Sequence, residues 1–154
     1  MNFAKLLTPK AVKVLSSTTS KKRLLSELGE LAETAYGLNA ANVVEALIAR
    51  EALGPTGVGH GVALPHARLS SVEEVTGLFV LLEKPVDFGS VDRQPVDIAF
   101  ALFAPENAGV EHLKALALVS RTLRDSSFCA KLRANHSTST LYTILTETES
   151  TKAA

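Results

Sequence analysis

The chain of 154 residues has little of what several classes of protein require. Its single cysteine, Cys129, excludes an internal disulfide and any zinc site built from several cysteines. Its 16 basic and 16 acidic residues balance, so nothing in the charge favours nucleic acid, whose phosphates need a basic surface. No apolar run approaches the roughly 20 residues of a membrane-spanning helix. We therefore expect no nucleic-acid partner and no membrane insertion.

The N-terminal segment also lacks the apolar stretch of a secretory signal, because Lys5, Pro9, Lys10 and Lys13 interrupt it. This predicts a cytoplasmic protein. The length, and a hydrophobic content of 46%, suit one domain over residues 1–154, with its core at about residues 20–147.

Apolar periodicity predicts helices towards both ends of the chain and strands between them. Ser20 and Asn39 are predicted N-caps of two successive helices, the first of which ends at Gly37. The runs 76–83 and 96–103 are apolar nearly throughout, which is typical of strands covered on two faces. Helical stripes resume beyond them. This order predicts an α/β fold, a three-layer domain with a mixed β-sheet flanked by helices on both faces.

Within these elements, the pattern also predicts which side chains are buried and where one strand ends. Val43, Leu47 and Ile48 lie at helical spacing on the expected buried face of the second helix, and Leu113 belongs to a later buried stripe. Pro85 is predicted to end the strand that begins near residue 76, because proline has no N–H to donate.

The most informative feature is a run rich in glycine that ends in a histidine. Residues 56–66, the glycine run, read Thr-Gly-Val-Gly-His-Gly-Val-Ala-Leu-Pro-His and end at His66. The alternating Gly57, Gly59 and Gly61 let the backbone approach a ligand closely and can form an anion-binding nest. Pro65 stiffens the backbone that presents the imidazole of His66. The run alone fits a structural turn with a core histidine equally well.

Two other residues are candidates beside the glycine run. Arg50 lies in the last turn of the second helix, where it is either a surface charge facing the helix dipole or a clamp for a phosphoryl group. His112 begins a later helix, whose dipole favours a neutral imidazole, although a solvated residue is the simpler interpretation. His60 and His136 are interpreted as solvated. No His-x-x-x-His pair occurs, and the glycine run holds no carboxylate, so we predict no metal site.

The glycine run resembles the phosphorylation-site signature of the fructose/mannitol-type enzyme IIA proteins of the bacterial phosphotransferase system. The similarity extends from about Ser20 to Leu145 and includes three further segments in the expected order: residues 50–54, 92–97 and 112–119. A free-standing chain of this length most resembles the nitrogen-regulatory branch of that family. One departure is Ala67, because the family usually has glycine directly after the active histidine.

The resemblance implies that His66 accepts a phosphoryl group from a histidine-phosphorylated, HPr-like phosphocarrier protein, without a cofactor. It also implies that Arg50 is the cationic clamp and that His112 is a neighbouring imidazole that contacts the phosphate. Phosphoryl transfer needs mainly positioning and charge stabilisation, which backbone N–H groups can supply. Gly57, Gly59 and Gly61 are accordingly the expected phosphate-binding loop.

Three functions stay open at this point. The first is a regulatory phosphocarrier, of the type that acts on nitrogen or potassium metabolism, whose output is binding to target proteins. The second is a sugar-specific (fructose/mannitol) enzyme IIA that passes the phosphoryl group to a transporter domain. The third is a binding module in which His66 is never phosphorylated. Family members can pair through surfaces near the site, so the resemblance leaves a homodimer open.

Overall fold

The structure, a computed structural model, describes residues 1–153, with side chains described as far as residue 147. Its six-stranded sheet consists of β1 (Val12–Leu15), β2 (Gly57–Gly59), β3 (Val62–Ala63), β4 (His66–Arg68), β5 (Thr76–Val86) and β6 (Val96–Ala104). The order in space is β1-β5-β6-β3-β2, and β4 also pairs with β6. Strand β1 is parallel to β5, and β3 and β4 are parallel to β6, whereas β5 and β6, and β2 and β3, are antiparallel. The predicted mixed sheet is confirmed.

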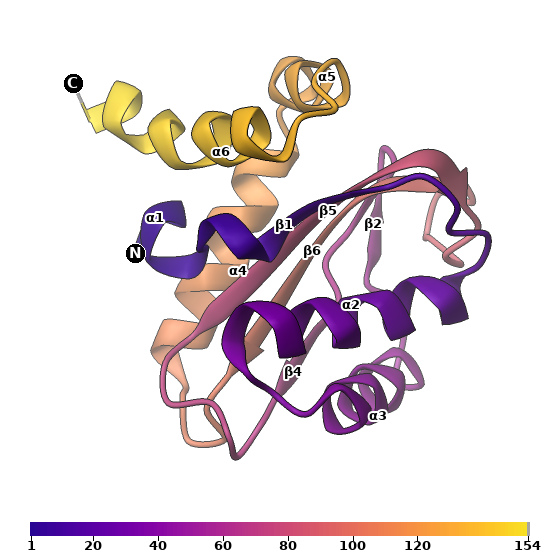
Figure 1. Cartoon of the computed structure of the whole chain (residues 1–154), viewed down its shortest axis with the longest axis vertical. Coiled ribbons are helices and arrows are strands. Elements are labelled where there is room, and N and C mark those ends of the chain that lie inside the picture. Colours follow the sequence, from indigo (N-terminus) through magenta and orange to yellow (C-terminus); the bar gives the residue numbers. More distant parts are fainter. Residues whose placement is uncertain (154) are drawn as a thin grey trace.

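The helical elements are α1 (Phe3–Leu6), the 3₁₀ turn η1 (Pro9–Ala11), α2 (Lys21–Tyr36), α3 (Ala40–Glu51), α4 (Val110–Leu123), α5 (Ser126–Arg133) and α6 (Thr138–Ala153). Figure 1 shows α2 and α3 in front of the sheet and α4 behind it, so the predicted α/β fold with helices on both faces is confirmed. Within residues 1–153, no helix combines the length and the apolar character needed to cross a membrane.

The predicted helix caps place the end of α3. The Ser20 hydroxyl accepts the Arg23 N–H at 3.0 Å, and the Asn39 side chain accepts the Asn42 N–H at 3.0 Å. Gly37 ends α2 in the left-handed conformation, with φ of 70°, which glycine adopts without a Cβ penalty. These three positions fold α3 back beside α2 and direct its C-terminal turn towards the glycine run.

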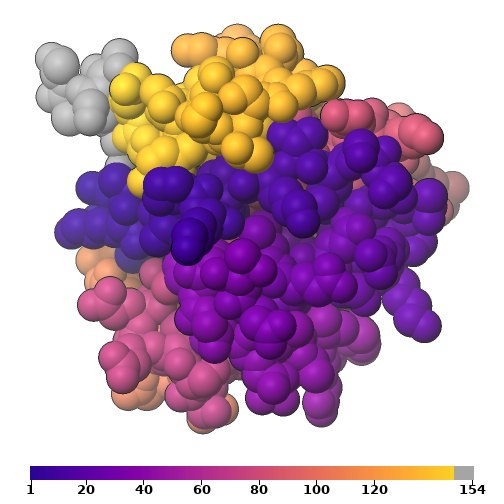
Figure 2. All heavy atoms as spheres, in the orientation of Figure 1, coloured from indigo at the N-terminus to yellow at the C-terminus, as the bar shows by residue number. Residues whose placement is uncertain are grey.

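The buried core begins earlier in the chain than the predicted core at about residues 20–147. Phe3 and Leu6 of α1 are fully buried, and the Phe3 ring lies edge-on to Phe100 of β6 at 5.5 Å. Figure 2 shows this N-terminal segment between α6 and the helices α2 and α3 on the same face of the molecule. The residues before the first predicted helix therefore include a helical turn, α1, that packs on the sheet.

Three predictions about individual residues are wrong. Strand β5 continues past Pro85 to Val86, because β1 pairs only as far as Leu82 and no neighbour on that side needs the missing N–H. Ile48 and Leu113, expected in the core, are 47% and 65% exposed. Their helices meet the sheet through other stripes, which leaves these two apolar side chains at the surface.

Candidate functional site

His66 begins β4, which runs parallel to β6 and pairs with it from Leu102 onwards. Strand β3 lies on the same edge of β6, and the break between the two is bridged where Leu102 donates its N–H to the Pro65 carbonyl at 3.0 Å. His66 thus stands where the strand resumes after proline, rather than at the end of a loop. Because Ala67 packs into the core, strand alternation points His66 and Arg68 to the other side.

The two nitrogens of the His66 imidazole have different partners. Nδ1 lies 2.9 Å from the Leu64 carbonyl oxygen, which can only accept, so Nδ1 carries the proton. Nε2 accepts a hydrogen bond from Arg50 Nε at 3.2 Å, through the lone pair that this tautomer leaves free. Arg50 Nη1 also donates to the Gly54 carbonyl at 3.0 Å, which fixes the guanidinium at the end of α3. The imidazole is therefore neutral, and its nucleophilic nitrogen is Nε2.

His112 lies against His66 from the opposite helix layer. It sits in the first turn of α4, its side chain is buried, and the two imidazole rings meet edge-on with centroids 5.6 Å apart. Its buried Nδ1 has no hydrogen-bond partner within the described part of the chain. His112 is therefore not the solvated helix-start residue that was the simpler interpretation.

Both imidazoles are held in their neutral form. Burial lowers the pKa of His66, and the charge of Arg50 lowers it further, against the opposing effects of the Leu64 carbonyl and the Glu51 carboxylate. Burial also lowers the pKa of His112, with additional contributions from His66 and the Arg68 guanidinium. A neutral imidazole has the lone pair that nucleophilic attack requires.

These groups line one open cleft of about 550 Å³, which we call the His66 cleft. Its polar lining consists of His66, His112, Arg50 and Arg68, and the remainder is apolar. The sequence analysis does not predict Arg68 as a site residue. The alternation of side chains along an extended segment is the signal that could have found it, because it puts residues 66 and 68 on one face. The apolar part includes Leu53 and Leu113, which are 83% and 65% exposed.

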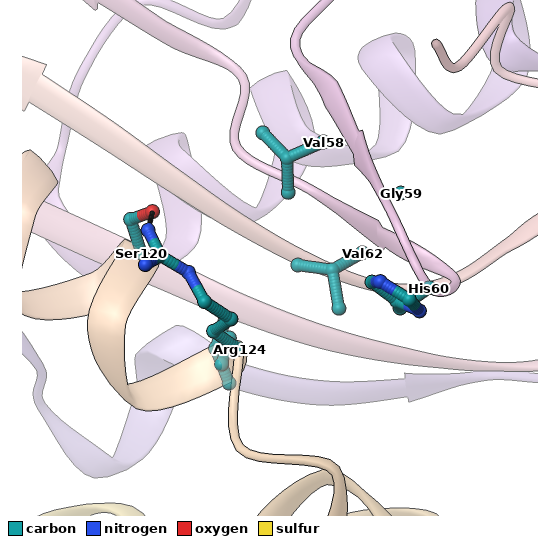
Figure 3. Close-up of a pocket in the computed structure, with 7 residues that line it drawn as sticks. Val58, Gly59, His60, Val62, Ser120 and Arg124 are labelled. Carbon is teal, nitrogen blue, oxygen red and sulfur yellow. Dashed lines mark hydrogen bonds between the residues drawn. The ribbon is translucent and has the colours of Figure 1, made fainter. Parts of the chain in front are cut away.

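The glycines of the run do not line the His66 cleft. Gly57 and Gly59 lie in β2, and Gly61 follows His60 in the turn that joins β2 to β3. Both turn residues have positive φ, 58° at His60 and 80° at Gly61, as a tight hairpin requires. Gly59 and His60 instead line a different, smaller pocket of about 100 Å³, and Figure 3 shows them with Arg124, the residue that follows α4, opposite.

Close packing accounts for two of these glycines. A Cβ on Gly57 would lie 2.2 Å from the Ser90 hydroxyl, and a Cβ on Gly61 would lie 2.7 Å from the Arg133 guanidinium. The Arg133 guanidinium in turn donates to the His60 carbonyl. The placement therefore gives no support to the expectation of a phosphate cradle around His66, and the glycines act in the hairpin.

Ala67, where the family usually has glycine, fits its position without strain. It lies in β4, pairs with Phe103, and is not among the residues with positive φ in the described part of the chain. Because an extended strand residue accepts any Cβ, alanine leaves the direction of His66 unchanged.

A neutral imidazole whose Nε2 contacts the Arg50 guanidinium, in a cleft that Arg68 also lines, suits transfer of an anionic group. No group of three or more metal-ligating side chains gathers anywhere in the portion of the chain that the structure describes.

Comparison with known proteins identifies the class. The chain belongs to the family described as phosphoenolpyruvate-dependent sugar phosphotransferase system, EIIA 2, which it matches over residues 5–148.

Within that family, the chain is similar to nitrogen regulatory proteins. It is 46% identical over 145 residues to the one from Bradyrhizobium diazoefficiens, covering 94% of this chain and 95% of the relative. It is 44% identical over 133 residues to that of Escherichia coli K12, covering 86% and 82%. The crystal structure of nitrogen regulatory protein IIA-Ntr from Neisseria meningitidis superposes with a TM-score of 0.84 at 40% identity, covering 92% of this chain and 97% of that one.

Proposed function

We propose that the chain is a regulatory phosphocarrier that accepts a phosphoryl group on Nε2 of His66 from a histidine-phosphorylated, HPr-like protein. The observation that carries this proposal is the tautomer of His66. The Leu64 carbonyl holds the proton on Nδ1, which leaves a lone pair on Nε2 of a histidine that lines the His66 cleft. The transfer forms a bond between His66 Nε2 and phosphorus as the bond from phosphorus to the donor's imidazole nitrogen breaks, so the donor regains its lone pair.

Arg50 occupies the lone pair of Nε2 before the reaction, so it must release this nitrogen as the phosphoryl group arrives. Its guanidinium is already beside the reacting atom and can turn its N–H groups to the phosphoryl oxygens. Arg68 places a second positive charge in the same cleft, and the unpartnered His112 Nδ1 is a further candidate contact. These groups stabilise the oxygens without a metal or another cofactor.

The rim of the His66 cleft suits the docking of a protein donor. Leu53, just beyond α3, and Leu113, in the first turn of α4, line this cleft and are 83% and 65% exposed. Apolar side chains around a cationic centre fit a partner that presents a phosphohistidine within an apolar surface. We propose that this exchange takes place in the cytoplasm.

A regulatory output is favoured over sugar transport, because the similar proteins described above are named nitrogen regulatory proteins. Phosphorylation adds roughly −1.5 to −2 charges at neutral pH. In the His66 cleft this charge would lie between the exposed Leu53 and Leu113, where it changes how target proteins bind. The alternative, a sugar-specific enzyme IIA, uses the same chemistry at His66 and differs in the acceptor.

The test is incubation with phosphoenolpyruvate and the general proteins of the phosphotransferase system, followed by intact-mass measurement. We expect the wild type to gain one phosphoryl group that is lost in acid and retained in alkali, as a phosphoramidate is. His66→Ala should gain none, whereas His136→Ala, which changes an exposed histidine, should be labelled normally. Label retained in His66→Ala, or an unlabelled wild type, contradicts the proposal.

A further inference from the structure

The strongest unexplained feature near the His66 cleft is a buried carboxylate that does not touch it. Glu51, the last residue of α3, has a side chain only 6% exposed. It accepts hydrogen bonds from Lys21 Nζ at 2.8 Å, from the Thr56 N–H at 3.3 Å, and from the Thr56 hydroxyl. A carboxylate this deeply buried is stable only when its oxygens are fully paired, so the three donors are what keep it there.

The pairing of Glu51 with Thr56 closes the 51–56 turn, and this turn contacts both residues that hydrogen-bond to the imidazole, Arg50 and Leu64. On one side of Glu51, Arg50 contacts His66 Nε2 and is anchored to the Gly54 carbonyl inside this turn. On the other side, the Thr56 carbonyl accepts the Leu64 N–H at 2.9 Å. Leu64 then offers its own carbonyl to His66 Nδ1.

Lys21 fixes the same carboxylate to the start of α2. Its ammonium group also lies 4.4 Å from the centre of the Phe88 ring, and Phe88 is fully buried. The contact with an aromatic face holds the ammonium in place beyond what the ion pair alone would do. Glu51 is therefore tied at once to α2, to α3 and to the start of the glycine run.

We propose that Glu51 is a positioning residue for His66. Through Thr56 and the 51–56 turn, Glu51 holds both Arg50 and the Leu64 carbonyl against the imidazole. The consequence for phosphoryl transfer rests on the function proposed above, whereas the geometry of the unphosphorylated imidazole does not. Second-layer groups of this kind fix the tautomer and orientation of a histidine through the hydrogen bond on its other nitrogen.

Glu51→Gln is the direct test, because it keeps the size of the side chain and removes its charge. A glutamine has one acceptor oxygen, and its NH₂ group would face the Lys21 or Thr56 donors. The charged and titratable groups that face His66 are Arg50 and Glu51 from α3, Arg68 from β4, and His112 from α4. Of these, Glu51 supplies the negative charge, so its loss lowers the pKa of His66 further.

Three readouts are expected to change together in Glu51→Gln. Long-range ¹⁵N–¹H NMR of the unphosphorylated protein should show a mixture of His66 tautomers, where the wild type shows proton on Nδ1. The pKa of His66, followed by NMR, should fall below the wild-type value. The rate of phosphorylation should drop about tenfold to a hundredfold, as expected for a reacting group that is slightly misplaced.

The chain contains a matched control in Glu27 of α2. Glu27 also accepts from a threonine hydroxyl, that of Thr18, and from a cation, Arg23, but within the described residues neither partner contacts His66. Glu27→Gln should leave the tautomer, the pKa and the rate at wild-type values. A general loss of stability would affect both variants, whereas a positioning role affects only Glu51→Gln.

The outcomes separate the two proposals. A wild-type tautomer and pKa for His66 in folded Glu51→Gln would overturn the positioning role, whatever the rate. If Glu51→Gln does not fold, Thr56→Val decides by the same NMR readouts, since it removes the hydroxyl and keeps the N–H. A changed tautomer in a chain whose wild type is never phosphorylated would retain the positioning role and reject the proposed function.

Discussion

Arg50 Nε donates a hydrogen bond to Nε2 of His66 across 3.2 Å. The guanidinium cation therefore contacts the one imidazole nitrogen that carries a lone pair. The contact joins the end of α3 to the start of β4. Burial lowers the pKa of His66 and the Arg50 charge lowers it further, so the imidazole stays neutral with the guanidinium beside the nitrogen that we propose is phosphorylated.

The first prediction concerns which nitrogen is modified. Because the Leu64 carbonyl retains the proton of Nδ1, phosphorylation of His66 should occur at Nε2 and give the Nε2-phosphohistidine. Heteronuclear ³¹P and ¹⁵N NMR of the labelled protein distinguishes the two isomers. Phosphorus coupled to Nδ1 would show that the Leu64 contact is broken in the reactive state.

The second prediction concerns the replacement of arginine by lysine at position 50. Arg50 uses Nε for His66 and Nη1 for the Gly54 carbonyl, and the single nitrogen of lysine cannot occupy both positions. Arg50→Lys should therefore slow phosphorylation by about a hundredfold, as the loss of one well-placed donor commonly does. Rapid-quench labelling measures the rate, with Arg23→Lys on the exposed face of α2 as the control. A wild-type rate in Arg50→Lys would mean that charge alone is required.

The third prediction links the imidazoles to stability. The folded pKa of His66 and of His112 lies below the ordinary value of 6.5, so the unfolded chain binds more protons as the pH falls. Their contribution to the free energy of unfolding is complete above about pH 6.5 and is lost as the pH falls towards the folded pKa values.

Urea unfolding between pH 8 and pH 5 measures this dependence. The stability of the wild type should decrease below pH 6.5, and His66→Gln should show a smaller decrease over the same interval. Equal slopes for the two proteins would show that His66 has the same pKa in the folded and unfolded chains.

The fourth prediction distinguishes a structural glycine from a phosphate ligand. Gly61 has φ of 80°, and an added Cβ would lie 2.7 Å from Arg133 Nη2 and 3.0 Å from Asp97 Oδ1. Gly61→Ala should lower the free energy of unfolding by about 1–3 kcal/mol, because it combines a left-handed backbone with a steric overlap. The phosphorylation rate of the folded variant should stay at the wild-type value. Slower phosphorylation with unchanged stability would instead show that Gly61 acts in phosphate binding.

Much of the fold can be predicted from local signals. Ser20, Gly37 and Asn39 mark the ends of α2 and the start of α3 through caps that involve residues three or four positions away. Ile48 and Leu113 were misplaced because helical periodicity identifies apolar stripes but not the stripe that another layer covers. Leu113 lines the His66 cleft, where its exposure has a use in the proposed docking of a carrier, whereas Ile48 lines a separate pocket between α2 and α3.

The sequence by itself determined most of the elements, the place of His66 after Pro65, and the family to which the chain is similar. Only the tertiary structure decided which groups surround His66. It brought Arg50 and His112 to the imidazole from opposite layers, added Arg68, and left the glycines in a separate hairpin. The buried carboxylate of Glu51 gave no local signal either. The physical reason is that caps and periodicity depend on neighbours within a few residues, whereas a site is formed by contacts between segments far apart in the chain.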